Sequence, residues 1–193
     1  LKPGIAAPQG TQYQYSGVNA FILSWLVEDI MNMPFQDAVS KEIWSKMGAE
    51  SDASILAPRY GVPIAHGGLL ARSRDVARFG LLYTPSYTKI SDSQIISDRM
   101  IDLILNDKNP NLTLKTNKAG QLPPDFSHSG YLWDAVYTND DFYRGGWAGQ
   151  GLLINPTKDI VAVYTGYAID PQESQPDLLP ILRQVLNNVF SNQ

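Results

Sequence analysis

Cysteine is absent from this chain of 193 residues, and only two histidines occur, His66 and His128. The missing cysteines exclude a disulfide framework, a thiol nucleophile and cysteine-ligated zinc or iron–sulfur centres. The two histidines are 62 positions apart, so they do not form the closely spaced ligand set of a typical zinc site. We therefore expect neither a metal nor another cofactor.

Positive charge is also scarce. Lys and Arg total 15 against 19 Asp and Glu, which gives a net charge of −4. A basic face for nucleic acid is therefore not expected. No apolar run approaches the roughly 20 residues that a membrane-spanning helix needs. With 44% apolar and 18% charged residues, the chain can bury a core, and its length suits one domain.

The first part of the chain, residues 1–105, is mainly helical. Apolar spacing and capping residues predict four helices: 18–30 capped by Ser16, a second opened by Pro34, a third capped by Ser73, and a fourth over 94–105 with a capping box from Ser91 to Gln94. Between the second and third helices, residues 48–71 are mostly irregular because they are rich in Gly and Pro.

The second part of the chain has a different pattern. Residues 106–130 are polar and are expected to form a long surface loop. Three β-rich runs then follow, at 131–137, 149–154 and 159–165, and residues 155–158 predict a hairpin turn between the last two. The chain continues into a final amphipathic helix over 178–189, which Asp177 caps and which tolerates Pro180 in its first turn. Helices, then antiparallel strands, then a C-terminal helix define an α+β fold.

Four segments stand out as candidates for chemistry. They are Gly10–Asn19, with a tyrosine just before the first helix; Ile43–Glu50; Gly67–Phe79; and Arg144–Gln150, which runs into a hairpin. In this order and spacing they resemble the serine β-lactamase-like hydrolases, a family that includes class C β-lactamases, D-alanyl-D-alanine carboxypeptidases, esterases and 6-aminohexanoate-dimer hydrolases. The resemblance is greatest to the last group, whose members carry similar Ile-Trp-x-x-Met/Leu-Gly-Ala-Glu and Gly-Gly-Leu-x-x-x-x-Arg-Asp-x-Ala-Arg-Phe-Gly segments.

The resemblance implies a partial β-lactamase/transpeptidase-like fold and a serine hydrolase that acts on an amide, ester or lactam through an acyl-enzyme. In this family a Ser-x-x-Lys motif, which supplies the nucleophile, lies well upstream of the tyrosine motif. Here the tyrosine motif begins at Tyr15. We therefore expect the chain to be the C-terminal portion of a single catalytic domain, with the nucleophile and the N-terminal part of the same protein upstream. The family also implies a periplasmic or secreted location.

One Ser-x-x-Lys does occur, at Ser86–Lys89. It follows Tyr15 instead of preceding it, and it lies in a turn behind Pro85 rather than at the start of a buried helix. A match to so short a motif is expected by chance in a chain of this length. Ser86 is therefore not expected to be the nucleophile.

Tyr15 is the residue to which the resemblance assigns acid/base catalysis. A lysine ammonium beside a tyrosine favours the phenolate, which can take the serine proton and later return it to the leaving group. The family's Tyr-x-Asn motif is Tyr15-Ser16-Gly17 here, so its asparagine amide is missing. Asn19, two residues further on, is a weaker candidate for contact with the substrate.

The segment that begins at Arg144 occupies the position of the family's Lys-Thr-Gly motif. The resemblance implies that Gly145 and Gly146 let a small-molecule or peptide-like substrate lie against the strand edge, and that Arg144 meets a carboxylate. The backbone N–H of Trp147 falls where the family places an oxyanion donor. The alternative interpretation is a glycine-rich packing turn with Trp147 in the core.

Other functions and roles remain open from the sequence. The same fold can serve a catalytically inactive penicillin-binding-like protein that holds a peptide or a cell-wall fragment, or the chain can be an unrelated α+β interaction domain. Five further polar residues are expected to have structural roles, the two histidines in loops or hydrogen bonds and the others in ion pairs: His66, His128, Arg74, Asp75 and Arg78.

Overall fold

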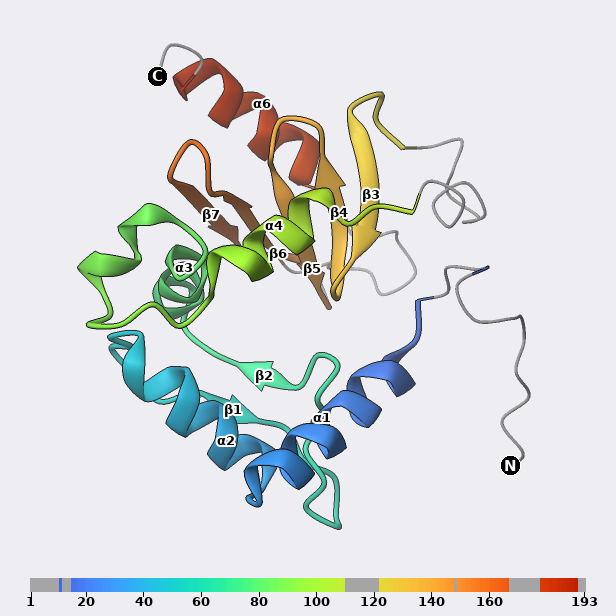
Figure 1. Cartoon of the computed structure of the whole chain (residues 1–193), viewed down its shortest axis with the longest axis vertical. Coiled ribbons are helices and arrows are strands. Elements are labelled where there is room, and N and C mark those ends of the chain that lie inside the picture. Colours follow the sequence, from blue (N-terminus) through green and yellow to red (C-terminus); the bar gives the residue numbers. More distant parts are fainter. Residues whose placement is uncertain (1–10, 12–14, 110–121, 148, 167–177, 191–193) are drawn as a thin grey trace.

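The computed structural model describes residues 11, 15–109, 122–147, 149–166 and 178–190, and it has the predicted α+β architecture (Figure 1). The helical elements are α1 (Gly17–Met31), α2 (Phe35–Glu42), the short 3-10 helices η1 (Trp44–Lys46) and η2 (Pro85–Lys89), α3 (Ser73–Leu81), α4 (Asp98–Asn106) and α6 (Leu179–Phe190). The strands of the main antiparallel sheet are β3 (Phe126–Gly130), β4 (Trp133–Tyr137), β5 (Phe142–Gly146), β6 (Gln150–Asn155) and β7 (Ile160–Tyr164), in that order. A two-stranded ladder pairs β1 (Ser54–Ile55) with β2 (Leu69–Leu70).

Helix boundaries follow the predicted capping residues with two exceptions. Ser16 is the N-cap of α1, and Pro34 precedes α2, as expected. Ser73 is the first residue of α3 rather than its cap. The fourth helix begins four residues later than predicted, because the hydroxyl of Ser97 accepts the Met100 N–H at 3.2 Å. Ser91 instead donates its hydroxyl to the Ser93 carbonyl, within the preceding turn.

Two strand predictions also need correction. The polar segment 106–130 is not loop throughout, because its last five residues form β3 and pair with β4. The run 131–137 is a strand only from Trp133. Tyr131 and Leu132 have φ values of 52° and 66° and form the two-residue turn between β3 and β4. Positive φ at both central residues matches the right-handed twist of a hairpin, although Asn and Gly are the residues that adopt it most easily. The predicted hairpin at 155–158 is confirmed between β6 and β7.

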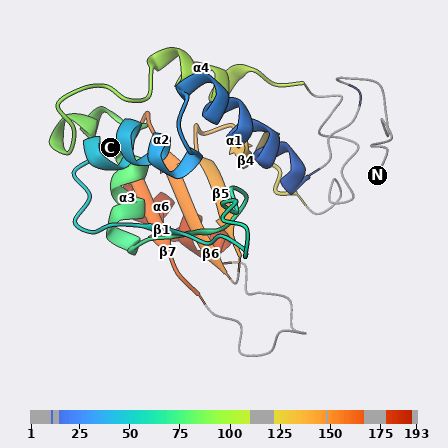
Figure 2. The ribbon, with the colours of Figure 1, turned by 90° about the horizontal axis from the view of Figure 1, so that it is seen from below.

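The core lies on both faces of the sheet. On one face, side chains of α3 and α4 pack against alternate residues of β4, β5 and β6, including Val136, Phe142 and Ile154. On the other face, Leu179, Leu182 and Leu186 of α6 pack against a second set of strand residues, among them Leu153. In Figure 1, α1, α2 and the short β1–β2 ladder lie together below the main sheet, and Figure 2 views the molecule from that side. No helix in the described part of the chain is long and apolar enough to cross a membrane.

Three aromatic rings form the centre of the first core. Trp133 and Phe142 pack edge to face with their centroids 4.5 Å apart, and Tyr83 contacts both at 5.4 and 5.6 Å. Such pairs contribute about 0.5–1.5 kcal/mol each beyond their burial. Burial raises the pKa of Tyr83 to about 12, so its hydroxyl stays protonated.

Arg183 attaches α6 to the sheet. Its guanidinium stacks on the ring of Tyr137, 3.6 Å from the centroid, and it forms ion pairs with Asp125 and Asp141. The hydrogen bond from Arg183 lowers the pKa of Asp125. Pro180 lies in the first turn of α6, as predicted, whereas the predicted cap Asp177 lies outside the described residues.

A first prediction concerns Gly80, where α3 approaches the sheet most closely. A Cβ atom at this position would lie 2.5 Å from Cγ1 of Val161 and 3.1 Å from Cδ1 of Leu152. Gly80→Ala should therefore lower the free energy of unfolding by about 1–3 kcal/mol, because the helix must move outward. Val161→Ala should restore part of the loss when it is added to Gly80→Ala. Denaturant unfolding of the wild type, the two single variants and the double variant measures the coupling between positions 80 and 161. Strictly additive changes in the free energy of unfolding would contradict the proposed steric contact.

A second prediction concerns pH. His128 lies buried in β3, with Nε2 3.0 Å from the Ile104 carbonyl. Burial lowers the pKa of His128 from its ordinary value of 6.5. Unfolding exposes the ring, so the unfolded chain takes up a proton that the folded chain resists. The stability that the folded chain has with a neutral His128 is therefore fully present above pH 6.5. It is lost as the pH falls below 6.5 towards the lowered pKa that His128 has in the folded chain. Unfolding free energies at pH 7.5 and 5.5 should differ less in His128→Gln than in the wild type, and equal differences would contradict this account.

Candidate functional site

One end of the sheet gathers most of the residues that the sequence singles out. Strand β5 ends at Gly146 and β6 begins at Gln150, so the connection 147–149 lies at this end. The register Ala135↔Tyr143 places the start of β4, and therefore the Tyr131–Leu132 turn, at the same end. The β6–β7 turn lies at the opposite end, about 17 Å away along β6.

Tyr15 meets Arg144 at this end of the sheet. Nη2 of Arg144 donates to the phenol oxygen of Tyr15 at 3.1 Å, and the guanidinium carbon lies 5.5 Å from the centre of the tyrosine ring. The two residues are 129 positions apart in the chain. Tyr15 comes just before α1 and is 61% exposed, so its side chain can be reached by a molecule bound at this end of the sheet. The fold thus joins two of the segments that sequence analysis selected separately.

Asp134 is a further residue of this cluster, and sequence analysis did not select it. Its Oδ1 accepts from Nη1 of Arg144 at 2.7 Å, and its Oδ2 accepts the Gly145 N–H at 2.7 Å. The same Nη1 also donates to the Leu132 carbonyl at 2.9 Å. One sequence signal was present, because Asp134 is the lone charged residue within the apolar run 131–137. Its partners depend on strand register, which the sequence does not give.

The strand edge at Gly145 is open to side chains because the β4–β5 ladder is short. Its paired residues are Ala135 with Tyr143 and Val136 with Phe142, whereas β5 pairs with β6 as far as Gly146. The Asp134 carboxylate therefore takes the Gly145 N–H that a longer β4 would have bound. N–H groups alternate in direction along a strand, so the Gly145 N–H points towards β4, whereas Trp147 lies in the turn that follows β5.

Trp147 is 85% exposed, so the interpretation that places it in the core is wrong. The glycines beside it have local steric causes. A Cβ on Gly146 would lie 2.7 Å from Cβ of Gln150, its cross-strand partner. A Cβ on Gly145 would lie 3.3 Å from Oδ2 of Asp134. The hairpin therefore needs small residues here whether or not a substrate lies against it.

The first turn of α1 contains the other residues of the tyrosine segment. The N–H of Asn19 donates to the Ser16 carbonyl at 3.2 Å, so Asn19 is part of this turn, and its side chain is exposed. The ring of His66 packs on Gly17, where a Cβ would lie 2.7 Å from Cδ2 of the ring, and it contacts Phe21 edge to face at 4.9 Å. A side chain two residues after Tyr15 would therefore collide with His66.

Two neighbouring groups add charge near this end of the sheet. Asp107 accepts the hydrogen bond of the Tyr131 hydroxyl, and this bond raises the pKa of Tyr131. Asp134 and Arg144 form an ion pair in which both side chains are about one-third exposed. The negative charge of Asp134 therefore lies beside the positive charge of Arg144. Among the described residues, no group of three or more His, Asp or Glu side chains could hold a metal ion.

Ser86 lies in a different environment. Its hydroxyl donates to Oδ2 of Asp159 at 2.7 Å, and its N–H donates to Oδ1 at 3.1 Å. Asp159 belongs to the β6–β7 turn, at the far end of the sheet from Gly146. Ser86 thus connects η2 to a hairpin, which supports the prediction that it is not a nucleophile.

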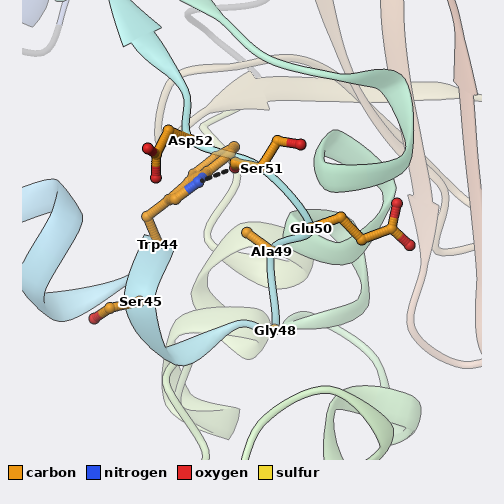
Figure 3. A pocket seen from close by; sticks show the side chains of 7 residues that line it. All are labelled: Trp44, Ser45, Gly48, Ala49, Glu50, Ser51 and Asp52. Atoms are coloured by element: carbon orange, nitrogen blue, oxygen red, sulfur yellow. Dashed lines mark hydrogen bonds between the residues drawn. The ribbon is translucent and has the colours of Figure 1, made fainter.

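A surface pocket of about 390 Å³ lies on the segment after α2 (Figure 3). Its lining residues form one stretch of chain: Trp44, Ser45, Gly48, Ala49, Glu50, Ser51 and Asp52. Across it the Trp44 indole N–H donates to the Ser51 carbonyl at 2.9 Å, and the Glu50 carboxylate pairs with arginines of α3. None of the residues that surround Tyr15 and Arg144 lines this pocket, so it is separate from the candidate site.

The expected ion pairs of α3 are confirmed. Asp75 is fully buried, and its Oδ1 accepts the Glu50 N–H at 2.8 Å and Nη1 of Arg78 at 3.3 Å. Arg74 and Arg78 both pair with Glu50. The segments 43–50 and 67–79 are therefore joined by one polar network that holds α3 against the preceding loop.

Comparison with known proteins identifies the family. The sequence model of the β-lactamase family matches residues 2–166. The chain is 24% identical over 160 residues to the 6-aminohexanoate-dimer hydrolase of Paenarthrobacter ureafaciens, an alignment that covers 83% of this chain and 40% of that protein. It superposes with a TM-score of 0.73 and 24% identity on a Bacillus anthracis protein with the provisional name 6-aminohexanoate-dimer hydrolase, covering 96% of this chain and 44% of the other.

A β-lactamase from Mycobacterium bovis has the same fold, with a TM-score of 0.65 at 18% identity; the superposition covers 95% of this chain and 66% of the other. The chain spans less than half the length of the two 6-aminohexanoate-dimer hydrolases. The family resemblance of the four sequence segments is thus confirmed along most of the chain, and the chain belongs to the β-lactamase family of hydrolases.

Proposed function

We propose that the complete protein is a serine hydrolase that cleaves an amide, ester or lactam through an acyl-enzyme, with its nucleophile in a part of the domain upstream of Leu1. The contact between Tyr15 and Arg144 carries this proposal, because it brings the tyrosine segment and the glycine-rich strand together at one accessible end of the sheet. The proposed substrate-binding residues there are Arg144, Gly145, Gly146 and Asn19.

Tyr15 is the proposed acid/base. Its phenol oxygen accepts a hydrogen bond from the Arg144 guanidinium, a charge-assisted donor that fixes the position of this oxygen at the end of the sheet. A phenolate can take the proton of the serine hydroxyl as the serine attacks the substrate carbonyl. The resulting phenol then returns this proton to the leaving nitrogen or oxygen when the tetrahedral intermediate collapses to the acyl-enzyme.

The oxyanion of that intermediate needs hydrogen-bond donors at the strand edge. We assign one donor to the Trp147 backbone N–H and the other to the N–H of the nucleophile itself. The short β4–β5 ladder supports this assignment, because β4 leaves the end of β5 without a backbone partner on that side. Three of the five guanidinium N–H groups of Arg144 have partners among the described residues, which leaves two for a substrate carboxylate.

The remainder of the catalytic domain is the proposed partner of α1. This helix carries apolar residues all around its circumference, a pattern of helices that are buried on every side. Six of them are nevertheless at least 45% exposed: Val18, Ile22, Leu23, Trp25, Leu26 and Ile30. An apolar surface of this extent on one helix marks an interface. The N-terminal part of the same protein is the occupant that we propose, and the chain covers only 40% and 44% of its two longer relatives.

The third prediction follows from this arrangement. The isolated chain should show no ester hydrolysis and no covalent labelling by an activated phosphonate, whereas the complete protein should show both. The chain alone should also bind the apolar dye ANS, and its sedimentation should reveal self-association, because α1 is uncovered. Peptide mapping locates any phosphonate. Labelling of Ser86 in the isolated chain would contradict the assignment of the nucleophile.

The fourth prediction concerns Tyr15 in the complete protein. Tyr15→Phe removes one hydroxyl and little volume, so kcat should fall by about 10²–10⁴ while KM changes little. Tyr60→Phe, at a tyrosine that is 86% exposed, is the matched control and should leave kcat unchanged. A decrease of less than about threefold for Tyr15→Phe would show that Tyr15 is only structural. If the wild type also fails to form an acyl-enzyme, the protein is instead a binding member of the family.

A further inference from the structure

We propose that Asp134 is the positioning residue of this site and that it fixes Tyr15 through Arg144. Asp134 does not itself contact Tyr15 in the described hydrogen bonds; its two carboxylate oxygens hold the Arg144 guanidinium and the Gly145 N–H, each at 2.7 Å. This inference rests on the proposed function, because it assigns a role within the same site.

The position of Asp134 in the sheet explains how one side chain reaches both partners. Extension of the register Ala135↔Tyr143 by one residue places Asp134 opposite Arg144, on the same face of the sheet. Beyond this point β4 supplies no backbone acceptor to β5. The carboxylate therefore replaces the missing strand partner of Gly145, with a charge-assisted bond that is stronger than a bond between neutral groups.

Arg144 transmits this constraint to Tyr15. Nη1 donates both to Asp134 and to the Leu132 carbonyl, so two bonds determine the plane of the guanidinium. With that plane fixed, Nη2 is directed at the Tyr15 oxygen, 3.1 Å away. A long, flexible arginine side chain without these two bonds has many rotamers, and the phenol oxygen would lose its defined donor.

The charge of Asp134 has a second effect, on the binding of charged substrates, that can be measured separately from kcat. Its negative charge compensates that of Arg144, so the wild-type site presents an ion pair to an incoming substrate. Replacement of the carboxylate by an amide leaves Arg144 without an ion-pair partner among the described residues. Loss of Asp134 should therefore lower kcat, because Tyr15 is less well placed, and at the same time strengthen the binding of substrates that carry a carboxylate.

Kinetics of the complete protein test this proposal, with two esters that differ only in a carboxylate on the acyl chain. Asp134→Asn should lower kcat for both esters by about tenfold to a hundredfold, as expected for misplacement of a catalytic group. The KM of the anionic ester should fall relative to that of the neutral ester. Asp134→Glu keeps the charge and should recover part of kcat. Asp102→Asn, the same change at an exposed position of α4, should alter neither ester.

Amide hydrogen exchange tests the geometry independently of activity. Asp134→Ala should accelerate exchange of the Gly145 N–H, because its acceptor is removed, whereas Asp102→Ala should not. Unchanged Gly145 exchange, or an Asp134→Asn variant with kcat within about threefold of the wild type, would overturn the proposal. If the wild type hydrolyses neither ester, the proposed function fails, and the exchange result still decides whether Asp134 organises this end of the sheet.

Discussion

The mutual packing of Tyr83, Trp133 and Phe142 is the interaction on which the arrangement of this chain depends. Trp133 directly precedes Asp134, and Phe142 lies two residues before Arg144, so the rings anchor the two strands from which the polar side chains project. Tyr83, which follows α3, packs against both of these rings and so brings its segment to the same two strands. Displacement of any one ring changes the register or the spacing of β4 and β5, and the polar cluster loses its geometry with them.

The two faces of the sheet differ in how they are held. The face towards α3 relies on close approach at Gly80 and on apolar side chains, whereas α6 is attached by Arg183, which combines ion pairs with stacking on Tyr137. Helix α1 depends on neither face, and its principal contact within the described structure is with α2. Tyr15, which lies just before α1 in the chain, is nevertheless held at the sheet by its hydrogen bond with Arg144. The segment that carries the proposed acid/base is thus fastened at one point of the sheet.

The helices and the β6–β7 hairpin were predictable because their signals are local: apolar spacing, a serine or proline at the start, and a turn sequence between two β-rich runs. β3 was missed because Ser127, His128 and Ser129 have no strand-forming pattern; pairing with β4 and the Ile104 carbonyl beneath His128 determine its structure. Tyr15 and Arg144 were selected by resemblance, yet their contact spans 129 positions and follows from no local pattern. Asp134 escaped selection because its role appears only once the strand register is known.

The contact between Gly17 and His66 constrains how this protein can evolve. The imidazole occupies the volume that any side chain at position 17 would need, so the two positions form a coupled pair. An asparagine two residues after Tyr15 would fit only if the exposed ring of His66 turned away, was lost, or moved with its loop. The order of the two substitutions therefore matters, because replacement of the histidine first avoids an intermediate with a steric clash.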